Sequence, residues 1–371
     1  MTKTSFEIFA VAPPGLETAL SIEARELGFA DAVAVPGGVT FQGGWPDVWR
    51  ANLALRGAGR VLVRVGSFLA FHLAQLDKRS RKFPWGDVLR TDVPVRVAVT
   101  TGKGSKIYHA GAAAQRIETA LREETGITIA DDAPVTLKVR IDDNVVTISV
   151  DTSGESLHMR GHKLAIGKAP MRETLAALFL RQCGYDGHEP VVDPMCGSGT
   201  FVIEAAEIAT GLLPGRSRDF AFMQLASFDA KAFAALRDAT PPHATACHFY
   251  GSDRDTGAVR NSAANAARSG ISDVTTFTHH AISDLQRPEG KPGLVIVNPP
   301  YGARIGNRNL LFPLYGALGQ TLLTRFSGWR VGLITSEAGL AKATGLPFLP
   351  ERTSVPHGGL KVTLFRTGPL K

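Results

Sequence analysis

Hydrophobic and polar positions recur with two different periods along the chain, and these periods predict strands and helices. Residues 5–11 alternate one by one, which predicts a strand, whereas residues 16–27 carry apolar side chains at helical spacing. Two short strand-like segments and a helical segment follow, at 32–35, 39–41 and 47–55. This order of elements is typical of a ferredoxin-like module, which we expect over residues 1–58.

The alternation continues through residues 59–155. Strands are expected at 60–65, 93–100, 135–141 and 145–150, and helices at 73–78 and 111–125. The last two strands are separated only by Asp142, Asp143 and Asn144, so we expect them to pair as a hairpin. This block is therefore predicted to be a second α/β module.

Residues 156–371 alternate strands with longer helices. Strands are expected at 191–192, 248–253, 274–277, 293–297 and 329–335, and helices at about 169–183, 201–213, 256–269 and 311–326. The fully apolar segment 293–297 is expected at the centre of a parallel sheet. Segment 216–245 is predicted to be an insertion with its own helix at 230–237, and residues 348–365 to be a closing hairpin.

The composition is that of a globular chain. Of its 371 residues, 44% are hydrophobic and 20% charged, and no apolar run is long enough to span a membrane. The first residues lack the apolar core of a signal peptide. Cys183, Cys196 and Cys247 have neither zinc-site spacing nor a disulfide pattern, so we expect a cytoplasmic protein without a metal site.

The net charge of +7 is unevenly distributed. Residues 60–106 hold ten basic and three acidic side chains, and the C-terminal half is also basic. Either a polyanionic partner or an ordinary solvated surface would account for this. Several basic side chains accompany Trp85, Tyr108 and His109, a combination that suits RNA phosphates and sugars. The candidate RNA-binding residues are Arg79, Arg81, Lys82, Lys103, Lys106 and Arg160.

A glycine turn follows the strand at 191–192. Gly197 and Gly199 allow a sharp bend, and the helix after them directs free N–H groups into the turn. A dinucleotide site would need a third glycine where Val202 stands, and a P-loop would need a lysine that is absent. The segment 193–200 resembles the first motif of class I methyltransferases that act on amino groups, where the turn holds S-adenosylmethionine (SAM). An ordinary βα turn is the alternative.

Two acids end the strand at 248–253 and begin the next helix. A carboxylate accepts two hydrogen bonds at once, so one of them can bind both hydroxyls of a ribose. Either acid can instead cap the helix. We assign Asp253 to the ribose and Asp255 to the cap.

The sequence Asn298-Pro299-Pro300-Tyr301 follows the most apolar strand. The prolines remove backbone donors and stiffen the loop. Its carbonyls and the Asn298 amide oxygen can then hold both hydrogens of an exocyclic amine, which directs the nitrogen lone pair at a methyl carbon. Tyr301 can stack on the base. Such catalysis works by positioning and electrostatics, although a merely rigid loop would show the same residues.

Further segments extend the resemblance over nearly the whole chain. They include 6–10, 14–17, 37–39, 151–158, 160–161 and 169–177. Together with the three motifs above, they resemble THUMP-domain RNA methyltransferases of the RlmL type, which make N2-methylguanine in 23S rRNA. The resemblance implies a ferredoxin-like domain over 1–58, a THUMP domain over 59–155, and a Rossmann-like methyltransferase domain over 156–371. The last would have a seven-stranded, mostly parallel sheet with an antiparallel C-terminal hairpin.

The resemblance also implies roles for single residues. The catalytic loop would be Asn298, Pro299, Pro300 and Tyr301. SAM would be held by Asp193, Pro194, Cys196, Gly197, Ser198, Gly199, Thr200, Asp253, Arg254, Asp284, Pro170, Arg172, Glu173 and Thr174. Many relatives carry an acid that contacts the adenine amine at the position of Ala281. In this chain three alternatives are open: Asp284 contacts the adenine amine, a backbone group contacts it, or the contact is missing.

Competing functions remain open. A tRNA guanine-N2 methyltransferase would have the same architecture, and DNA adenine or protein glutamine methyltransferases share the Asn-Pro-Pro-Tyr loop. The basic block at 60–106 argues against the last two. A non-catalytic RNA-binding assembly factor is the alternative from another class. We expect a monomer or weak homodimer with RNA as partner and no membrane association.

Overall fold

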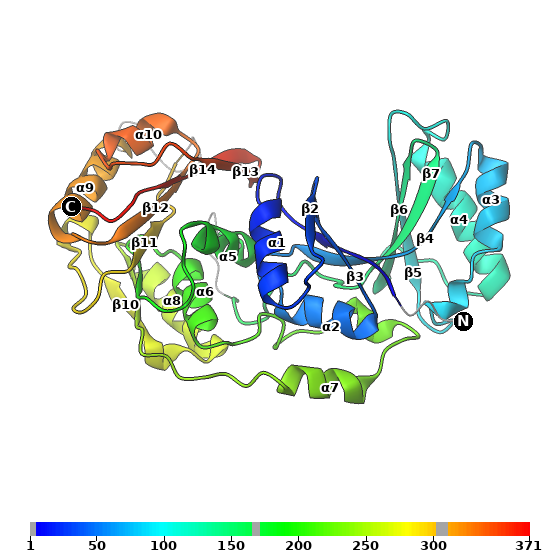
Figure 1. Ribbon diagram of the computed structural model, residues 1–371, viewed down its shortest axis with the longest axis horizontal. Helices are drawn as coiled ribbons and strands as arrows, with labels where there is room; N and C mark the ends of the chain where they lie inside the picture. Colours follow the sequence, from blue (N-terminus) through cyan, green and yellow to red (C-terminus); the bar gives the residue numbers. More distant parts are fainter. Residues whose placement is uncertain (1–4, 165–170, 302–310) are drawn as a thin grey trace. The chain divides into compact units, whose positions relative to one another are not determined.

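The structure is a computed structural model that describes residues 5–164, 171–301 and 311–371. It contains two compact units, each built around one seven-stranded sheet (Figure 1). Unit 1 comprises Met1–Ala12, Ser21–Leu157 and Arg218–Ala239, and unit 2 comprises Pro13–Leu20, His158–Ser217 and Thr240–Lys371. Within the described residues, no helix combines the length and the apolar character needed to cross a membrane.

Unit 1 contains the strands β1 (Phe6–Val11), β2 (Val33–Val35), β3 (Gly38–Gly43), β4 (Arg60–Leu69), β5 (Val95–Thr101), β6 (Val135–Asp142) and β7 (Val145–Asp151). Its helices are α2 (Trp45–Ala54), α3 (Leu73–Arg81), α4 (Ala110–Thr125) and α7 (Ala230–Asp238), with 3-10 turns at Trp85–Asp87 and Ala221–Gln224. Helix α1 (Glu17–Glu26) continues from unit 2 into unit 1. The sheet order is β2-β3-β1-β4-β7-β6-β5, antiparallel except for the pair β5–β6.

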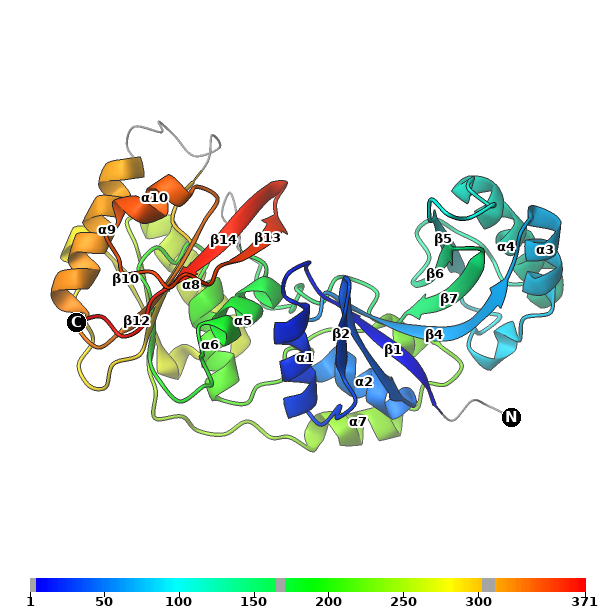
Figure 2. The ribbon, with the colours of Figure 1, turned by 45° about the horizontal axis from the view of Figure 1, so that its top comes forward.

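Strand β4 belongs to both halves of this sheet, as Figure 2 shows. Its first half pairs with β1, where Arg60 lies opposite Val11, and from Leu62 onward it pairs with β7. The two stretches overlap at Leu62–Arg64, and a bulge between Arg64 and Gly66 then interrupts the pairing with β7. The expected ferredoxin-like and THUMP modules thus share one continuous sheet.

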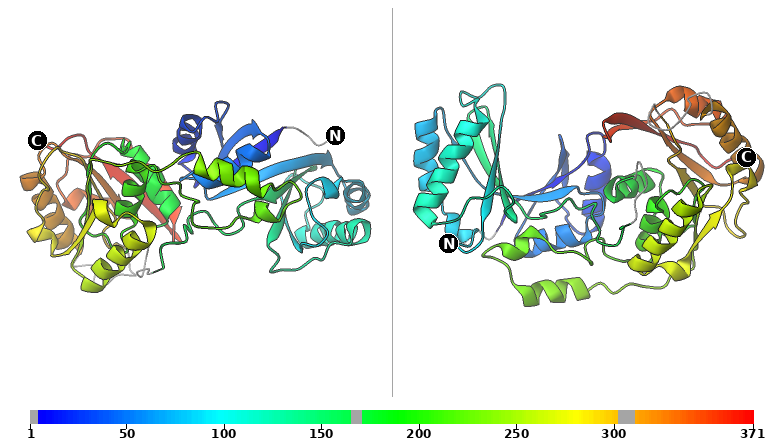
Figure 3. Two further views of the ribbon diagram at one scale, coloured as in Figure 1. Left: turned by 90° about the horizontal axis from the view of Figure 1, so that it is seen from below. Right: turned by 180° about the vertical axis from the view of Figure 1, so that it is seen from behind.

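The insertion after the glycine-turn helix packs within unit 1. Its helix α7 contacts α2, and the 3-10 turn before it carries Phe222. The Phe222 ring lies 6.3 Å from the Trp49 ring of α2 and 5.2 Å from that of Phe233, between ring centroids. Figure 3 shows the ribbon of this segment, and its rings complete the aromatic core of the N-terminal unit.

Unit 2 contains the strands β8 (Val191–Asp193), β9 (Phe249–Asp253), β10 (Thr275–His279), β11 (Leu294–Val297), β12 (Arg330–Thr335), β13 (Thr353–His357) and β14 (Leu360–Arg366). Its further helices are α5 (Glu173–Gln182), α6 (Thr200–Ala209), α8 (Thr256–Ser269), α9 (Leu311–Arg325) and α10 (Ala338–Ala343), with 3-10 turns at Ser272–Val274 and Ile282–Asp284. The sheet order is β10-β9-β8-β11-β12-β14-β13.

The order of these strands confirms the expected Rossmann-like sheet. Strands β10, β9, β8, β11 and β12 are parallel, and the β13–β14 hairpin is antiparallel. The chain moves outward from β8 to β10, returns to the centre, and then moves outward the other way from β11. Helices α9 and α10 cover one face, and α5, α6 and α8 the other (Figure 1). Strands β8 and β11 therefore flank the switch point where such sheets bind ligands.

Candidate active site

Three polar side chains stand at the carboxyl ends of the central strands of unit 2. Asp193 ends β8, Asp253 ends β9, and Asn298 follows β11 directly. Because β9, β8 and β11 are parallel neighbours, these ends lie at one edge of the sheet. The three motifs predicted from sequence thus meet at the switch point.

The glycine turn between β8 and α6 is fixed from behind. The Ser262 hydroxyl of α8 donates to the Gly197 carbonyl at 2.8 Å, and the Asn265 amide donates to the Ser198 carbonyl at 3.1 Å. Gly199 has a φ of 80° and begins α6. The Gly197 N–H donates to Asp253 and the Gly199 N–H donates to the Cys196 carbonyl at 2.7 Å, so the N–H groups of Ser198 and Thr200 are the candidate donors of the described turn to an anionic ligand.

Two of the predicted cofactor residues are buried beside this turn. Cys196 is 6% exposed, and burial raises the pKa of its thiol, so its side chain is a packing group. Its backbone N–H donates to the Ser252 carbonyl of β9 at 2.9 Å. Pro194 is buried as well. Neither side chain carries a charge that could contact a ligand. Any contribution of Pro194 and Cys196 to binding therefore comes from the shape that they give the turn.

Of the two acids at the end of β9, Asp255 caps the next helix, as the sequence predicted. The Asp255 carboxylate accepts from the Gly257 N–H at 2.7 Å and caps α8, which confirms its assignment. Asp253 accepts from the N–H groups of Gly197 and Asp255, both at 3.0 Å. It is only half-buried, so its carboxylate keeps lone pairs on a side open to a ligand. Its ribose contact remains a prediction.

Asp193 is a fully enclosed carboxyl group. It is 2% exposed and accepts a hydrogen bond from the Met195 N–H at 3.1 Å. Burial raises its pKa to about 8, and the nearby charge of Asp253 acts in the same direction. No cation of the described residues offsets this burial. An ammonium group placed here would compensate the carboxylate.

The loop after β11 contains an unused acceptor. The Asn298 Oδ1 atom is buried and has no hydrogen-bond partner among the residues that the structure describes. The Pro300 carbonyl beside it accepts from the Tyr315 hydroxyl of α9 at 3.3 Å. Tyr301 packs partly against the core beneath α9, and burial raises its pKa to about 12. A buried acceptor without a partner is costly, and a ligand N–H would satisfy it.

These residues fit SAM. Asp193 can receive the ammonium of its methionine end, and the turn N–H groups its carboxylate. Among the residues that the structure describes, a Cβ atom at Gly197 would meet no other atom within 4 Å. Asp253 can take ribose hydroxyls. The donor set therefore matches an amino acid joined to a nucleoside.

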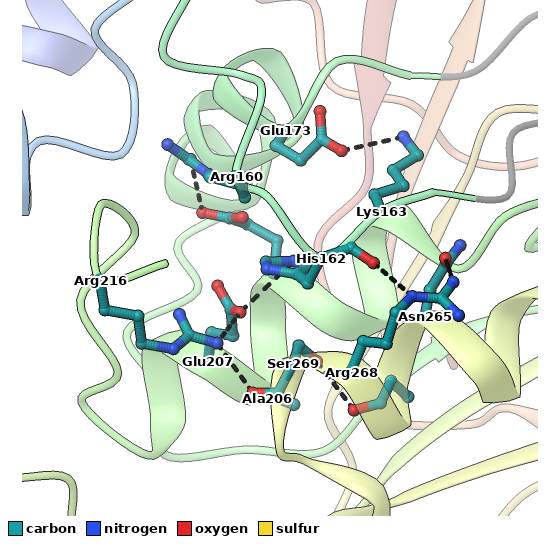
Figure 4. Close-up of polar contacts among 12 residues, drawn as sticks. Arg160, His162, Lys163, Glu173, Ala206, Glu207, Arg216, Asn265, Arg268 and Ser269 are labelled. Atoms are coloured by element: carbon teal, nitrogen blue, oxygen red, sulfur yellow. Dashed lines mark hydrogen bonds and ion pairs between the residues drawn. The ribbon is translucent and has the colours of Figure 1, made fainter. Parts of the chain in front are cut away.

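The segment before α5 contacts the end of the same turn, because the Thr200 hydroxyl donates to the Met171 carbonyl at 3.4 Å. Figure 4 shows Glu173, at the start of α5, paired with Lys163. Glu173 and Thr174 are buried, whereas Arg172 is exposed; Pro170 lies outside the described residues. Lys163, which sequence analysis overlooked, forms an ion pair with Glu173 at 3.1 Å and donates to the Thr200 hydroxyl at 2.8 Å. Burial raises the pKa of Glu173, and the charge of Lys163 opposes this rise. Lys163 thus joins α5 to the first turn of α6.

Arg160 corrects the sequence analysis. We predicted an RNA contact, but the residue is 2% exposed and pairs with Glu204 of α6 at 3.2 Å (Figure 4). One turn further on, the Glu207 carboxylate pairs with Arg216 at 2.6 Å and faces His162. Because RNA phosphates cannot reach a buried guanidinium, Arg160 is a structural residue of unit 2.

The remaining RNA candidates belong to unit 1. The side chains of Arg79, Lys82, Lys103 and Lys106 are exposed. Arg81 is different, because its guanidinium pairs with Asp77, Glu123 and Glu124, which raises its pKa. Its charge is thus largely matched within the unit. Trp85 is also unsuited to RNA contact, since it is 2% exposed and its indole donates to the Ser80 carbonyl.

Two predicted cofactor residues lie on the outer side of the strand ends. Arg254 is exposed after β9, and Asp284 is exposed in the 3-10 turn that starts just after Ala281. The Arg325 guanidinium of α9 fixes this turn by donating to the carbonyls of Ser283 and Leu285 at 2.8 and 2.7 Å. Asp284 is thus held near the edge of the sheet, and its contact with an adenine amine remains a prediction.

Comparison with known proteins identifies the family. Residues 160–358 match the model of the RMKL-like methyltransferase domain, and residues 7–62 match that of the RlmL ferredoxin-like domain. The chain belongs to the RMKL-like methyltransferase family. It is therefore a SAM-dependent methyltransferase, and its N-terminal domain is ferredoxin-like, as the resemblance implied.

Solved structures that match along almost the whole chain share its fold. SMU.472, crystallised with S-adenosylhomocysteine (SAH), is 26% identical with a TM-score of 0.85, and the alignment covers 100% of this chain and 99% of the other. A predicted N6-adenine-specific DNA methylase from Listeria monocytogenes is 29% identical with a TM-score of 0.85, covering 98% and 97%. TrmN from Thermus thermophilus shares the fold at 21% identity and a TM-score of 0.78, covering 98% and 100%.

Proposed function

We propose that this methyltransferase acts on RNA and transfers a methyl group to the exocyclic N2 amine of a guanine, in 23S rRNA. The proposal depends most on one observation, the buried Oδ1 atom of Asn298 that has no hydrogen-bond partner in the described part of the chain. An exocyclic amine supplies the N–H donor that this oxygen lacks. The partly buried loop Asn298–Tyr301 would hold such an amine beside the cofactor edge.

The loop chemistry accounts for activation of a poor nucleophile. The lone pair of a base amine is delocalised into the ring. If the Asn298 Oδ1 atom and the Pro299 carbonyl accept its two hydrogens, the nitrogen is drawn out of the plane and its lone pair points at the donor methyl group. SAM supplies a methyl carbon bound to a positively charged sulfur. Transfer of this methyl group to the amine would leave the sulfur with the electron pair of the broken C–S bond, and the amine would lose one proton to solvent.

The ferredoxin-like match and the basic segment 60–106 support RNA as the substrate. Residues 7–62 match the RlmL ferredoxin-like domain, and the exposed lysines and arginine of the following module can contact phosphates. The loop chemistry itself fits adenine as well as guanine, and the Listeria relative bears the name of an N6-adenine DNA methylase. The base and the nucleic acid are therefore the quantities to measure.

The test is a transfer assay with radiolabelled SAM. It offers total rRNA and total tRNA from a strain that lacks the protein, together with genomic DNA, and identifies the labelled nucleoside after digestion. We expect N2-methylguanosine in 23S rRNA. Asn298→Ala should reduce the rate by two orders of magnitude or more, as loss of a transition-state acceptor does, at roughly 10²–10³-fold. Asn298→Asp keeps an acceptor and should retain part of the rate.

Other outcomes would revise the proposal in defined ways. The same nucleoside in tRNA would keep the mechanism and replace the substrate. N6-methyladenine in DNA would replace both base and nucleic acid. If the protein bound SAM firmly but methylated none of the nucleic acids offered, nucleic acid would be excluded as the methyl acceptor. If Asn298→Ala retained full activity, the role of the loop would be wrong, provided that its SAM affinity and unfolding midpoint match the wild type.

A further inference from the structure

Three loops of unit 1 are joined at one end of its sheet. They are the segment after β4, the segment between β5 and α4, and the turn between β6 and β7. Asn144 links them: its carbonyl accepts from the Ala70 N–H, and its Oδ1 accepts from the Lys106 N–H, both at 2.9 Å. Its own N–H donates to the buried Ser105 hydroxyl at 3.4 Å. The loop ends are therefore held together by specific hydrogen bonds.

The turn itself has a demanding backbone. Asp143 and Asn144 have φ values of 46° and 61°, as both central residues of a tight hairpin turn require. Asparagine tolerates this conformation better than most residues, and here its side chain also bonds the neighbouring loop. On the far side, the Ser105 hydroxyl donates to the Ile141 carbonyl of β6 at 3.1 Å. The loops are thus fixed to the sheet and present their side chains from a rigid base.

Large apolar side chains are exposed on this base. Tyr108 is 81% exposed, more than any other large apolar or aromatic side chain of the described residues. Leu69, Phe71 and Val145 are 47%, 41% and 38% exposed, and Leu69 lies opposite Val145 in the β4–β7 pairing. Elsewhere in unit 1, the aromatic side chains of Trp49 and Trp85 are buried. Exposed aromatic rings on a hydrogen-bonded scaffold indicate a binding surface.

Positive charge accompanies these rings. The Lys106 ammonium lies 5.5 Å from the centre of the Phe71 ring, and Lys103 is exposed on the same loop. Arg140 pairs with Asp142 at 2.8 Å at the end of β6, which leaves Asp143 as the acid opposing the two lysines. The surface therefore combines aromatic faces with a small excess of cations, as sites for single-stranded nucleic acid do.

We propose that Tyr108, with Phe71 and Lys106, forms a stacking site for an unpaired nucleotide. This inference rests on the proposed RNA substrate, and it identifies the feature of the RNA that unit 1 binds. In a duplex the faces of the bases are covered by their neighbours, so an exposed ring gains nothing from them. An unpaired base stacks on the Tyr108 ring, and its phosphates lie near Lys103 and Lys106. Because every base has a π face, the site tolerates different sequences.

The test measures binding of the full chain to two probes by fluorescence anisotropy. One probe is a short single-stranded RNA without self-complementarity, and the other is the blunt duplex of the same sequence. Tyr108→Ala should weaken binding to the single strand roughly tenfold, the usual size of one lost stacking contact. It should leave duplex binding unchanged. Tyr108→Phe keeps the ring and should bind the single strand like the wild type.

Two further variants separate stacking from charge and from general surface change. Lys106→Ala should reduce the slope of log affinity against log salt by about one phosphate contact, whereas Tyr108→Ala should not change this slope. Val33→Ala removes another exposed apolar side chain of unit 1, 57% exposed on β2, and should bind both probes normally.

Several results would overturn the stacking site. These are unchanged single-strand binding by Tyr108→Ala, equal losses for strand and duplex, or a Tyr108→Phe variant as weak as the alanine variant. A wild-type dimer that Tyr108→Ala converts to a monomer, with unchanged RNA affinity, would assign the surface to self-association instead. The transfer assay is independent: binding that follows this pattern without methyl transfer to RNA would refute the proposed function and keep the stacking site.

Discussion

The two sheets of the molecule each have seven strands, but they gather polar side chains in different ways. In unit 2 five parallel strands end at one edge, so Asp193, Asp253 and Asn298 meet although they are far apart in sequence. In unit 1 most neighbours are antiparallel and send successive strand ends to opposite edges. Strand order alone therefore does not bring the strand-end residues of unit 1 together.

This difference explains how each unit prepares a binding surface. Unit 2 obtains its site from strand order, and then fixes the glycine turn through Ser262 and Asn265 of α8. Unit 1 must tie separate loops together by side-chain hydrogen bonds, as Asn144 does. A parallel sheet therefore assembles distant motifs by topology, whereas an antiparallel sheet requires local anchors for the same purpose.

The largest expected effect tests whether the insertion belongs energetically to unit 1. Phe222 is fully buried, and its ring is 5.0 Å from the Phe220 ring. Phe222→Ala should lower the free energy of unfolding of unit 1 by about 3–5 kcal/mol, because it removes a large buried ring and leaves a cavity. Denaturant unfolding, monitored by hydrogen exchange, shows whether unit 1 or unit 2 has lost stability.

The control for this variant is Phe312→Ala in α9, where the ring is 47% exposed. It should change stability by no more than about 0.5 kcal/mol. If Phe222→Ala instead destabilised the glycine-turn sheet and left unit 1 intact, the insertion would belong to unit 2 energetically, and the comparison of two independently packed units would not hold.

The second prediction concerns the buried ion pair of unit 2. Arg160→Met leaves the Glu204 carboxylate in the interior without this guanidinium, and breaking such a pair costs about 3–5 kcal/mol. We expect a lower urea midpoint for unit 2 and unchanged affinity for both RNA probes. The exposed pair Arg90–Asp92 of unit 1 provides the contrast, since Arg90→Met should leave the midpoint as it is. Weaker RNA binding by Arg160→Met at equal folded fraction would restore the original RNA assignment.

Sequence patterns predicted the parallel sheet of unit 2 well, because its determinants are local. Continuous apolar strands, a glycine turn and polar residues directly after strands each occupy a few neighbouring positions. The prediction that Asp255 caps α8 is confirmed for the same reason, since it depends on three consecutive residues. The helix α10 was missed, being only six residues long with little apolar periodicity.

Long-range contacts were beyond the sequence patterns. Arg160 and Glu204 are 44 residues apart, and nothing near Arg160 signals a buried partner. Segment 216–245 was predicted as an insertion, but the packing of its Phe222 ring on Trp49 joins segments that the sequence assigns to different domains. Strand β4 was expected to stop at Val65, yet it continues past Gly66 because β7 pairs with it on the other side of the bulge. The domain boundary at residues 58 and 59 remains a prediction.

The third prediction contrasts glycines of the two units. Gly199 and Gly37 have φ values of 80° and 83°, so alanine costs each about 1–2 kcal/mol of backbone strain. At Gly199 the new Cβ atom would also lie 3.1 Å from the Ser262 Cβ atom and displace the turn that faces the cofactor. Gly199→Ala should therefore weaken SAM binding, measured by calorimetry. Gly37→Ala should destabilise unit 1 and leave the SAM affinity unchanged. Equal SAM affinity in the two variants would contradict the assigned turn.

The smallest expected effect is a proton released when SAM binds. The pKa of Asp193 is raised to about 8, so the carboxyl group is mostly protonated at pH 7 in the free protein. An ammonium placed beside it favours the ionised form, lowers this pKa and releases up to about one proton. SAM affinity should then tighten as the pH rises from 6 to 7, by no more than about tenfold, while the SAM ammonium stays charged. Calorimetry in buffers of different ionisation enthalpy counts the proton.

Asp193→Asn should abolish this proton release and weaken binding. In the wild type, the folded state holds a proton on Asp193 that the unfolded state loses near pH 4, so this group lowers the stability as the pH rises from about 4 to about 8. Asp193→Asn should remove this fall in stability. Asp229→Asn is the matched control, because Asp229 caps α7 of unit 1 by accepting from the Ala232 N–H at 2.9 Å. Undiminished proton release by Asp193→Asn would show that the proton comes from another group, and the ammonium would then need a different partner at the edge of the parallel sheet.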